Sequence, residues 1–164
     1  MRRRTSERAR SPSRQGNRGD RRANAGRDRV RVLVDTSALV ALVNGRDQWH
    51  ERAVRSARAN TASGVRFVST VLVLAEFHAR LMYLRGADHA RRATMSFLDD
   101  PAHEWLDVDA ALVGHAIARW ILRFADQQFS LTDAVSFEVM RRERIKHAFA
   151  FDRHFETAGF ALLE

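Results

Sequence analysis

The sequence contains no cysteine, which excludes a disulfide scaffold, a thiolate metal site and a cysteine nucleophile. This absence fits a reducing compartment, and we expect a cytoplasmic protein. No run approaches 18 apolar residues, so neither a membrane-spanning helix nor a membrane partner is predicted. The glycines form no phosphate-binding loop, and no His-Glu-x-x-His motif of a zinc hydrolase occurs. These absences remove several common classes of enzyme site.

The positive charge is concentrated at one end of the chain. Residues 1–28 carry ten Arg against Glu7, Asp20 and Asp28, a net charge of 10 − 3 = +7 of the total +8. This segment has too few apolar residues to offset the entropy of ordering it, so we predict a disordered Arg-rich tail and a folded core over 29–164. The tail is either an arm that binds nucleic acid or a dispensable extension.

Short apolar segments alternate with helical patterns along the core. Strands are expected at 30–35, 65–69, 104–108, 148–152 and 160–163, and helices at 36–43, 49–60, 70–85, 87–98, 109–125 and 130–144. On the long helix over 109–125, Ile117 and Trp120 are expected on the buried stripe. The strands are continuous apolar runs, which is typical of a sheet covered on both faces. This order predicts an α/β fold around a central, mostly parallel sheet.

Four acidic residues stand where folding alone favours other residue types. Asp35 and Asp152 end two predicted strands, Glu76 interrupts an apolar helix, and Asp133 lies at the start of another helix. Because ligands of open α/β sheets bind beyond the carboxyl ends of strands, we expect these acids to converge at one edge of the sheet.

Each acid also has a purely structural interpretation. Asp35 and Asp133 suit the first turns of the helices that they begin, where a carboxylate accepts from free backbone amides. Glu76 could pair with Arg80 one turn later, and Asp152 could pair with a neighbouring side chain at the surface. Taken together these interpretations weaken, because two carboxylates about 6 Å apart repel by roughly 3 kcal/mol at an effective dielectric constant of about 20. A divalent cation with oxygen ligands, Mg²⁺ or Mn²⁺, would relieve that repulsion.

Four segments of the core resemble PIN-domain ribonucleases of the VapC type, the toxins of type II toxin–antitoxin pairs. The matching segments are Val32–Leu39, Leu74–Phe77, Ser130–Phe137 and Ala150–Phe155, followed by Gly159-Phe160. The resemblance implies a three-layer α/β/α fold. It also implies an acidic pocket that binds Mg²⁺, with Mn²⁺ as a substitute. The implied catalytic and metal residues are Asp35, Glu76, Asp133 and Asp152, and the implied accessory residues are Thr36, Thr132 and Asp126.

The resemblance further implies a Mg²⁺-dependent endoribonuclease that leaves a 5′-phosphate and a 3′-hydroxyl. It implies RNA as the substrate, a small antitoxin as a partner, and a homodimer. The alternative is a catalytically silent PIN-like module that binds RNA or protein, although the presence of all four acids favours catalysis. Seven arginines of the core could bind RNA phosphates or simply form solvated helix faces. They are Arg80, Arg85, Arg91, Arg92, Arg141, Arg142 and Arg144.

Overall fold

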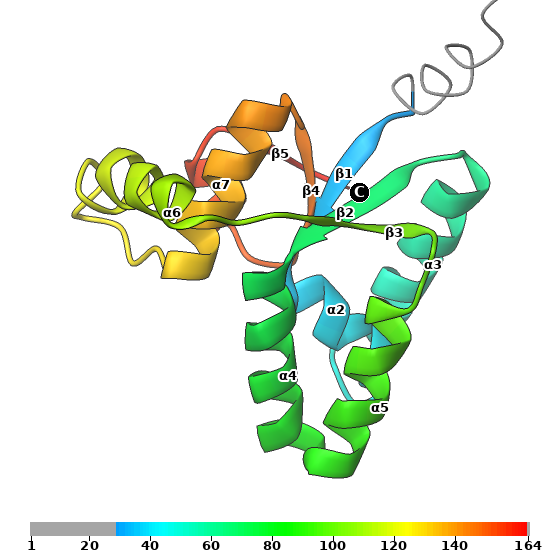
Figure 1. The fold of residues 1–164 in the computed structure, drawn as a ribbon. Coiled ribbons are helices and arrows are strands. Elements are labelled where there is room, and N and C mark those ends of the chain that lie inside the picture. The colour runs from blue at the N-terminus through cyan, green and yellow to red at the C-terminus, as the bar shows by residue number, and fades with distance from the viewer. Residues whose placement is uncertain (1–28, 164) are drawn as a thin grey trace, which may run out of the picture.

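The computed structural model describes residues 29–163, so the predicted tail over 1–28 lies outside the described residues. A parallel five-stranded sheet in the order β3-β2-β1-β4-β5 forms the centre (Figure 1). The strands are β1 (Arg31–Val34), β2 (Arg66–Thr70), β3 (His103–Leu106), β4 (His147–Phe149) and β5 (Ala161–Leu162). This arrangement confirms the predicted α/β fold.

Helices cover both faces of the sheet. They are α2 (Thr36–Val43), α3 (His50–Ala62), α4 (Val71–Arg85), α5 (Ala87–Leu98), α6 (Ala110–Ala116), the π-helix η1 (Ile117–Ile121), α7 (Leu131–Glu143) and α8 (His154–Thr157). Successive residues of β1 point to opposite faces. Val32 and Val34 join the core beneath α2, α4 and α5, whereas Leu33 joins the core beneath α6 and α7. None of the helices within 29–163 is long and apolar enough to cross a membrane.

The helix predicted over 109–125 is interrupted. Asp109 caps α6 through the amide of Leu112, but a π-helical turn follows, in which the amide of Leu122 donates to the carbonyl of Ile117 at 3.0 Å. A π turn adds a residue and rotates the following side chains. Trp120 is buried as expected, but the placement of Ile117 on the buried stripe was wrong, since it is 36% exposed.

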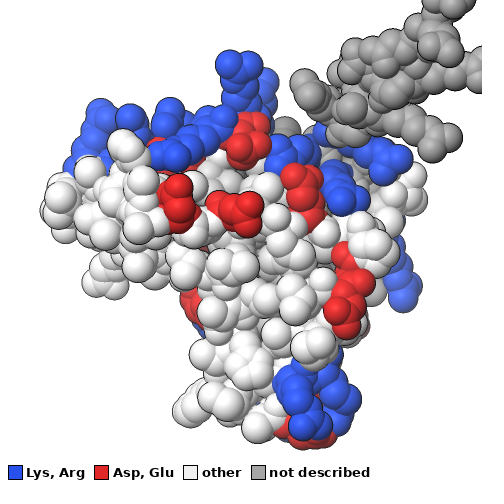
Figure 2. All heavy atoms as spheres, in the orientation of Figure 1, with Lys and Arg blue, Asp and Glu red and all other residues white. Residues whose placement is uncertain are grey.

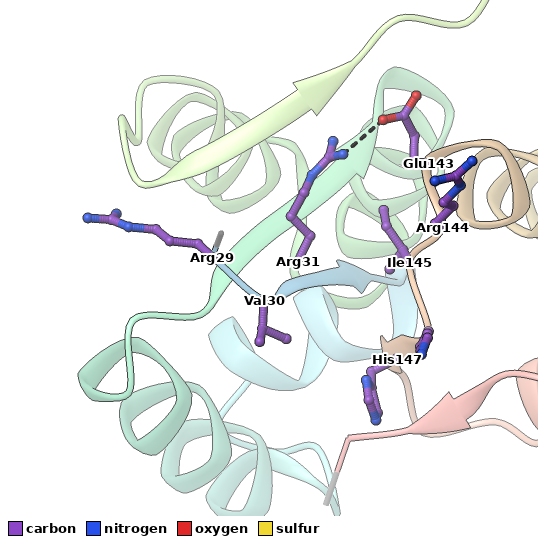
Figure 3. Close-up of a pocket in the computed structure, with 8 residues that line it drawn as sticks. Arg29, Val30, Arg31, Glu143, Arg144, Ile145 and His147 are labelled. Atoms are coloured by element: carbon purple, nitrogen blue, oxygen red, sulfur yellow. Dashed lines mark hydrogen bonds and ion pairs between the residues drawn. The ribbon is translucent and has the colours of Figure 1, made fainter. Parts of the chain in front are cut away.

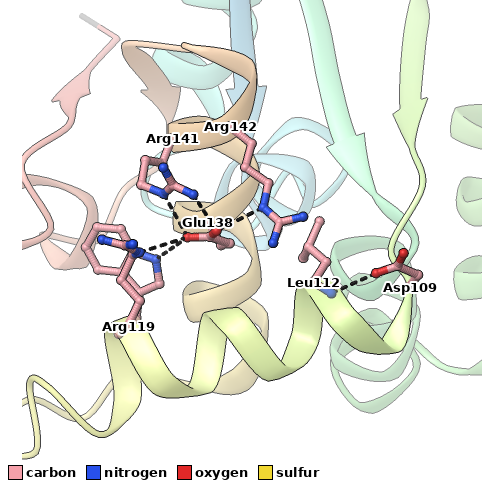
Figure 4. Close-up of polar contacts among 7 residues, drawn as sticks. Asp109, Leu112, Arg119, Glu138, Arg141 and Arg142 are labelled. Carbon is pink, nitrogen blue, oxygen red and sulfur yellow. Dashed lines mark hydrogen bonds and ion pairs between the residues drawn. The ribbon is translucent and has the colours of Figure 1, made fainter.

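The π turn places Trp120 beside a buried acid that sequence reasoning did not single out. Glu138, only 1% exposed on α7, accepts hydrogen bonds from Arg141, Arg142 and the indole of Trp120, and Arg119 lies 3.5 Å away (Figure 4). These bonds, chiefly from Arg141, lower the pKa of Glu138 to about 2. The buried carboxylate therefore fastens η1 and α7 together while its cationic partners stay at the surface.

We predict that Glu138→Gln destabilises the protein at pH 7 by about 2 kcal/mol, because the arginines lose charge-assisted bonds. The pKa of Glu138 is lower in the folded than in the unfolded protein, so its contribution is complete above about pH 4.5 and is lost as the pH falls toward 2. Urea unfolding at pH 7 and pH 3 measures this difference. The matched change Glu51→Gln, on an exposed ion pair, should cost little at either pH. Equal losses for both variants would contradict the role of Glu138.

Candidate metal centre

The carboxyl ends of the parallel strands bring three of the predicted acids to one edge of the sheet. Asp35 follows β1 directly, and its amide donates to the carbonyl of Phe149 at the end of β4. Asp133 lies in the first turn of α7, whose N-terminus lies at the same edge. Asp152 lies three residues beyond β4, since that strand ends at Phe149 and not, as expected, at Asp152. The chain bends after β4, and Asp152 accepts from the amide of His154 at 3.0 Å.

Asp35 is held by a hydroxyl that the sequence analysis missed. The amide of Ser37 donates to Asp35 Oδ2 at 2.9 Å, and the Ser37 hydroxyl donates to the same oxygen at 2.7 Å. Ser37 Oγ in turn accepts from the amide of Phe151 at 3.0 Å. One serine thus fixes the acid after β1 relative to the segment after β4. The signal in the sequence was the Asp-x-Ser spacing at a helix start, where an N-cap oxygen meets the N2 residue.

Asp133 takes part in two sets of contacts. It forms a capping box with Ser130, in which its Oδ2 accepts from the Ser130 amide at 2.9 Å. The same oxygen lies 3.2 Å from Nδ1 of His154. Ligand atoms of Asp133, Asp152 and His154 all lie within 4.8 Å of one another. His154, which the sequence analysis did not assign to the site, therefore joins the two acids.

The structural and functional interpretations of these acids are compatible. Within residues 29–163, every hydrogen bond accepted by the carboxylates of Asp35 and Asp133 goes to Oδ2. The other oxygen of each carboxylate remains for a ligand. Asp152 likewise uses only Oδ1, for the amide of His154. A donor set of carboxylate oxygens beside one imidazole fits Mg²⁺ or Mn²⁺, of which Mn²⁺ accepts the imidazole more readily.

Burial and neighbouring negative charge raise the pKa values of Asp35 and Asp152. Burial raises the pKa of Asp35 to about 6, the bonds from Ser37 oppose this shift, and the charges of Asp152 and Asp133 add to it. The pKa of Asp152 is raised chiefly by burial and also by Asp133, while His154 and Arg80 oppose the shift. The site therefore disfavours full negative charge in the absence of a cation.

The remaining predicted acids form no hydrogen bond with this group among the described residues. Glu76 is half-buried on α4 and, like Asp35, lies outside the group formed by Asp133, Asp152 and His154. Among the described residues it forms no ion pair with Arg80, so the structural pairing considered for it is absent. Asp126 is exposed and accepts from the side chain of Gln127.

The two threonines beside the acids differ in burial. Thr36 is buried, and its Oγ1 has no hydrogen-bond partner within the described part of the chain. Thr132 is half-buried beside Asp133. Buried hydroxyls are normally satisfied, so the unpaired oxygen next to Asp35 is available to a ligand or a water at this edge.

The PIN-domain family profile matches residues 32–161, which is most of the chain. This chain belongs to the PIN-domain family. Its fold is similar to that of VapC20 from Mycobacterium tuberculosis, a toxin that cleaves the sarcin–ricin loop. The TM-score is 0.71 and the identity 33%, over 79% of this chain and 96% of the other. The curated 23S rRNA-specific endonuclease VapC20 of the same species is 46% identical over 41 residues, a segment that spans only 31% of its length and 25% of this chain.

Two more distant structures share the PIN fold. The VapBC2 structure from Rickettsia felis, solved with a DNA fragment from its promoter, has a TM-score of 0.61 and 14% identity over 80% of this chain and 96% of the other. FitAcB from Neisseria gonorrhoeae has a TM-score of 0.57 and 13% identity over 81% of this chain and 96% of the other. At these identities the likeness concerns the fold alone.

We predict that Asp35→Asn stabilises this PIN domain in EDTA. The folded pKa of about 6 lies above the ordinary value of 3.8, so the ionised carboxylate opposes folding increasingly as the pH rises from about 4 to 6. The variant should gain about 2 kcal/mol above pH 6 and nothing below pH 4. Urea unfolding across this range measures the gain, with the exposed Asp99→Asn as the control. A loss of stability above pH 6 would contradict the assignment of a destabilising charge.

Proposed function

We propose that this PIN domain is a metal-dependent endoribonuclease, the toxin of a toxin–antitoxin pair, that acts in the cytoplasm. The observation that carries the proposal is the convergence of Asp35, Asp133 and Asp152 at the carboxyl edge of the sheet. Among the described residues, one oxygen of each carboxylate accepts no hydrogen bond. Membership of the PIN family and the 33% identity to a ribosomal-RNA-cleaving toxin support it.

The proposed roles follow from the position of each side chain. Asp35 and Asp133 would ligate Mg²⁺ or Mn²⁺ directly, and Asp152 would complete the set, directly or through water. Glu76 is assigned to the same pocket from the family resemblance, with Thr36, Thr132 and Asp126 as accessory residues. A bound cation supplies charge neutralisation at the scissile phosphate and lowers the pKa of a water held beside it.

The chain's own groups would position and deprotonate the attacking water. A carboxylate of the site would orient that water and accept its proton. His154 is held through its Nδ1 against Asp133, which fixes the plane of its ring at the mouth of the site. In-line attack that displaces the 3′-oxygen would leave a 5′-phosphate and a 3′-hydroxyl, the products that the family resemblance implies. No protein nucleophile is needed.

We also propose protein partners for this domain. A cognate antitoxin and a homodimer are inferred from the VapC resemblance. Large exposed apolar side chains, which a protein partner could cover, lie on α4 and α5. They are Val71, Met82, Tyr83, Leu84, Met95 and Leu98.

The proposal predicts that purified protein cleaves RNA only with a divalent metal. The first substrates are a synthetic sarcin–ricin-loop RNA, chosen from the similarity to VapC20, and total RNA. Cleavage should stop in EDTA and return with Mg²⁺ or Mn²⁺. Asp35→Asn and Asp133→Asn should each reduce the rate by at least about a hundredfold, while the exposed Asp99→Asn should not.

Two outcomes would contradict this proposal in different ways. Cleavage by Asp35→Asn at the wild-type rate would remove that residue from the site. Failure of folded, metal-loaded, antitoxin-free protein to cleave either RNA would favour the alternative, a catalytically silent module that binds RNA or protein.

A further inference from the structure

The edge of the sheet opposite the acids is strongly basic. Figure 2 shows Lys and Arg side chains gathered along the end of the molecule where β1 begins and α7 ends, with acidic side chains beside some of them. A hollow of about 340 Å³ at this end is lined by Arg29, Arg31, Arg144 and Lys146, with Glu143 as its one carboxylate. An adjoining hollow of about 590 Å³ shares Arg144 and Lys146 and adds Arg141.

The cations of this end differ in how far they are neutralised. Arg31 is held between Glu104 and Glu143, and Arg141 is bonded to Glu138. By contrast, the exposed side chains of Arg29, Arg144 and Lys146 take part in no ion pair among the described residues. Figure 3 shows the side chain of Arg29 extending away from the Arg31–Glu143 pair. We call Arg29, Arg144 and Lys146 the basic edge.

The backbone at Arg144 indicates that this cation is not placed for folding alone. Arg144 caps α7 in the left-handed conformation, with φ of 57°, and it is the one non-glycine residue with positive φ among the described residues. Glycine or asparagine is favoured there, because a side chain costs about 1 kcal/mol in that conformation. The last turn of α7 already carries Arg141 and Arg142 to complement the helix dipole. Neither helix capping nor the helix dipole therefore accounts for an arginine at position 144, whereas the binding of an anionic ligand would.

The sequence just before the basic edge is also rich in arginine. Residues 1–28, which precede Arg29 in the sequence, carry a net charge of 10 − 3 = +7. Arginine forks match phosphate oxygens in pairs, which lysine cannot do. Both features fit the backbone of a nucleic acid.

The acid site and the basic edge lie at opposite ends of α7. Asp133 is near the start of that helix and Arg144 follows its end, so eleven residues of helix separate them by roughly 16 Å at 1.5 Å per residue. At the roughly 3.4 Å per nucleotide of a DNA strand, about five nucleotides cover that span, and an RNA strand needs a similar number. An RNA placed for cleavage is long enough to reach both ends.

We propose that the basic edge is a second RNA-binding surface, which holds phosphates of the substrate at a distance from the bond that is cut. This inference rests on the proposed function only in taking RNA as the ligand. The acids select and cut the bond, whereas the basic edge supplies affinity without reading sequence.

Binding is measured on full-length protein carrying Asp35→Asn, in EDTA, with a fluorescein-labelled 30-nucleotide single-stranded RNA of mixed sequence. The test variant adds Arg144→Asn and Lys146→Gln, of which the first suits the left-handed backbone. The matched control adds Arg46→Gln and Arg52→Gln, which remove the same charge from two exposed arginines that form no ion pair among the described residues and lie outside the basic edge. Melting temperatures verify that all three proteins are folded.

We expect the test variant to bind about tenfold more weakly at 0.1 M salt, and the slope of log K against log salt to fall by about 1.4, since each phosphate contact contributes about 0.7. The control should retain its affinity and slope. Equal effects of the two variants would overturn the proposal in favour of diffuse net charge, and so would no effect or no binding at all. Because the measurement needs no cleavage, a failure of the basic edge is distinguishable from a failure of the nuclease assignment.

Discussion

The organisation of this domain depends on the burial of a carboxylate at the end of its central strand. Asp35 is 4% exposed, and it stays there because Ser37 donates two hydrogen bonds to one of its oxygens. The same serine accepts from the amide of Phe151, which fixes the segment that carries Asp152. The contacts of Ser37 therefore support the N-cap of α2, align the ends of β1 and β4, and position the acids. A cation at this edge would compensate the repulsion that these contacts maintain.

The parallel strands give the sheet two different edges, and the charged residues at these edges differ in sign. All described strands run parallel, so the carboxyl ends and the amino ends lie at opposite edges. Asp35, Asp133 and Asp152 lie at the carboxyl edge. Arg29, Arg144 and Lys146, which form no ion pair among the described residues, lie at the amino edge, and α7 connects the two edges. Glu138 fastens α7 to η1 midway along this connection and leaves Arg141 and Arg142 at the surface. An acidic edge and a basic edge are thus connected by one helix.

Much of this structure could be predicted from local patterns. Apolar runs such as Val32–Val34 and the polar residues that begin each helix placed most elements to within a few residues, because strand burial and helix capping are short-range effects. The end of β4 and the continuous helix over 109–125 were wrong. The convergence of Asp35, Asp133 and Asp152 followed from the rule that strand ends share an edge. The role of Glu76 remains a prediction from the family resemblance.

Other features depend on contacts that the sequence does not encode locally. The π turn at Ile117–Ile121 rotates Ile117 outward, and no spacing of apolar residues reveals it. His154 joins the acids because the chain bends after β4, and Ser37 acts across 114 residues on Phe151. Such long-range contacts are fixed by tertiary packing and appear only once the fold is known.

The central claim, that the buried acids form a divalent-cation site, is tested most directly by crystallography with Mn²⁺. Anomalous diffraction locates the ion independently of any activity. The account predicts an anomalous peak within ligand distance, about 2.2 Å, of carboxylate oxygens of Asp35 and Asp133, and its loss in Asp133→Asn. A peak elsewhere, or none at saturating Mn²⁺, would contradict the claim.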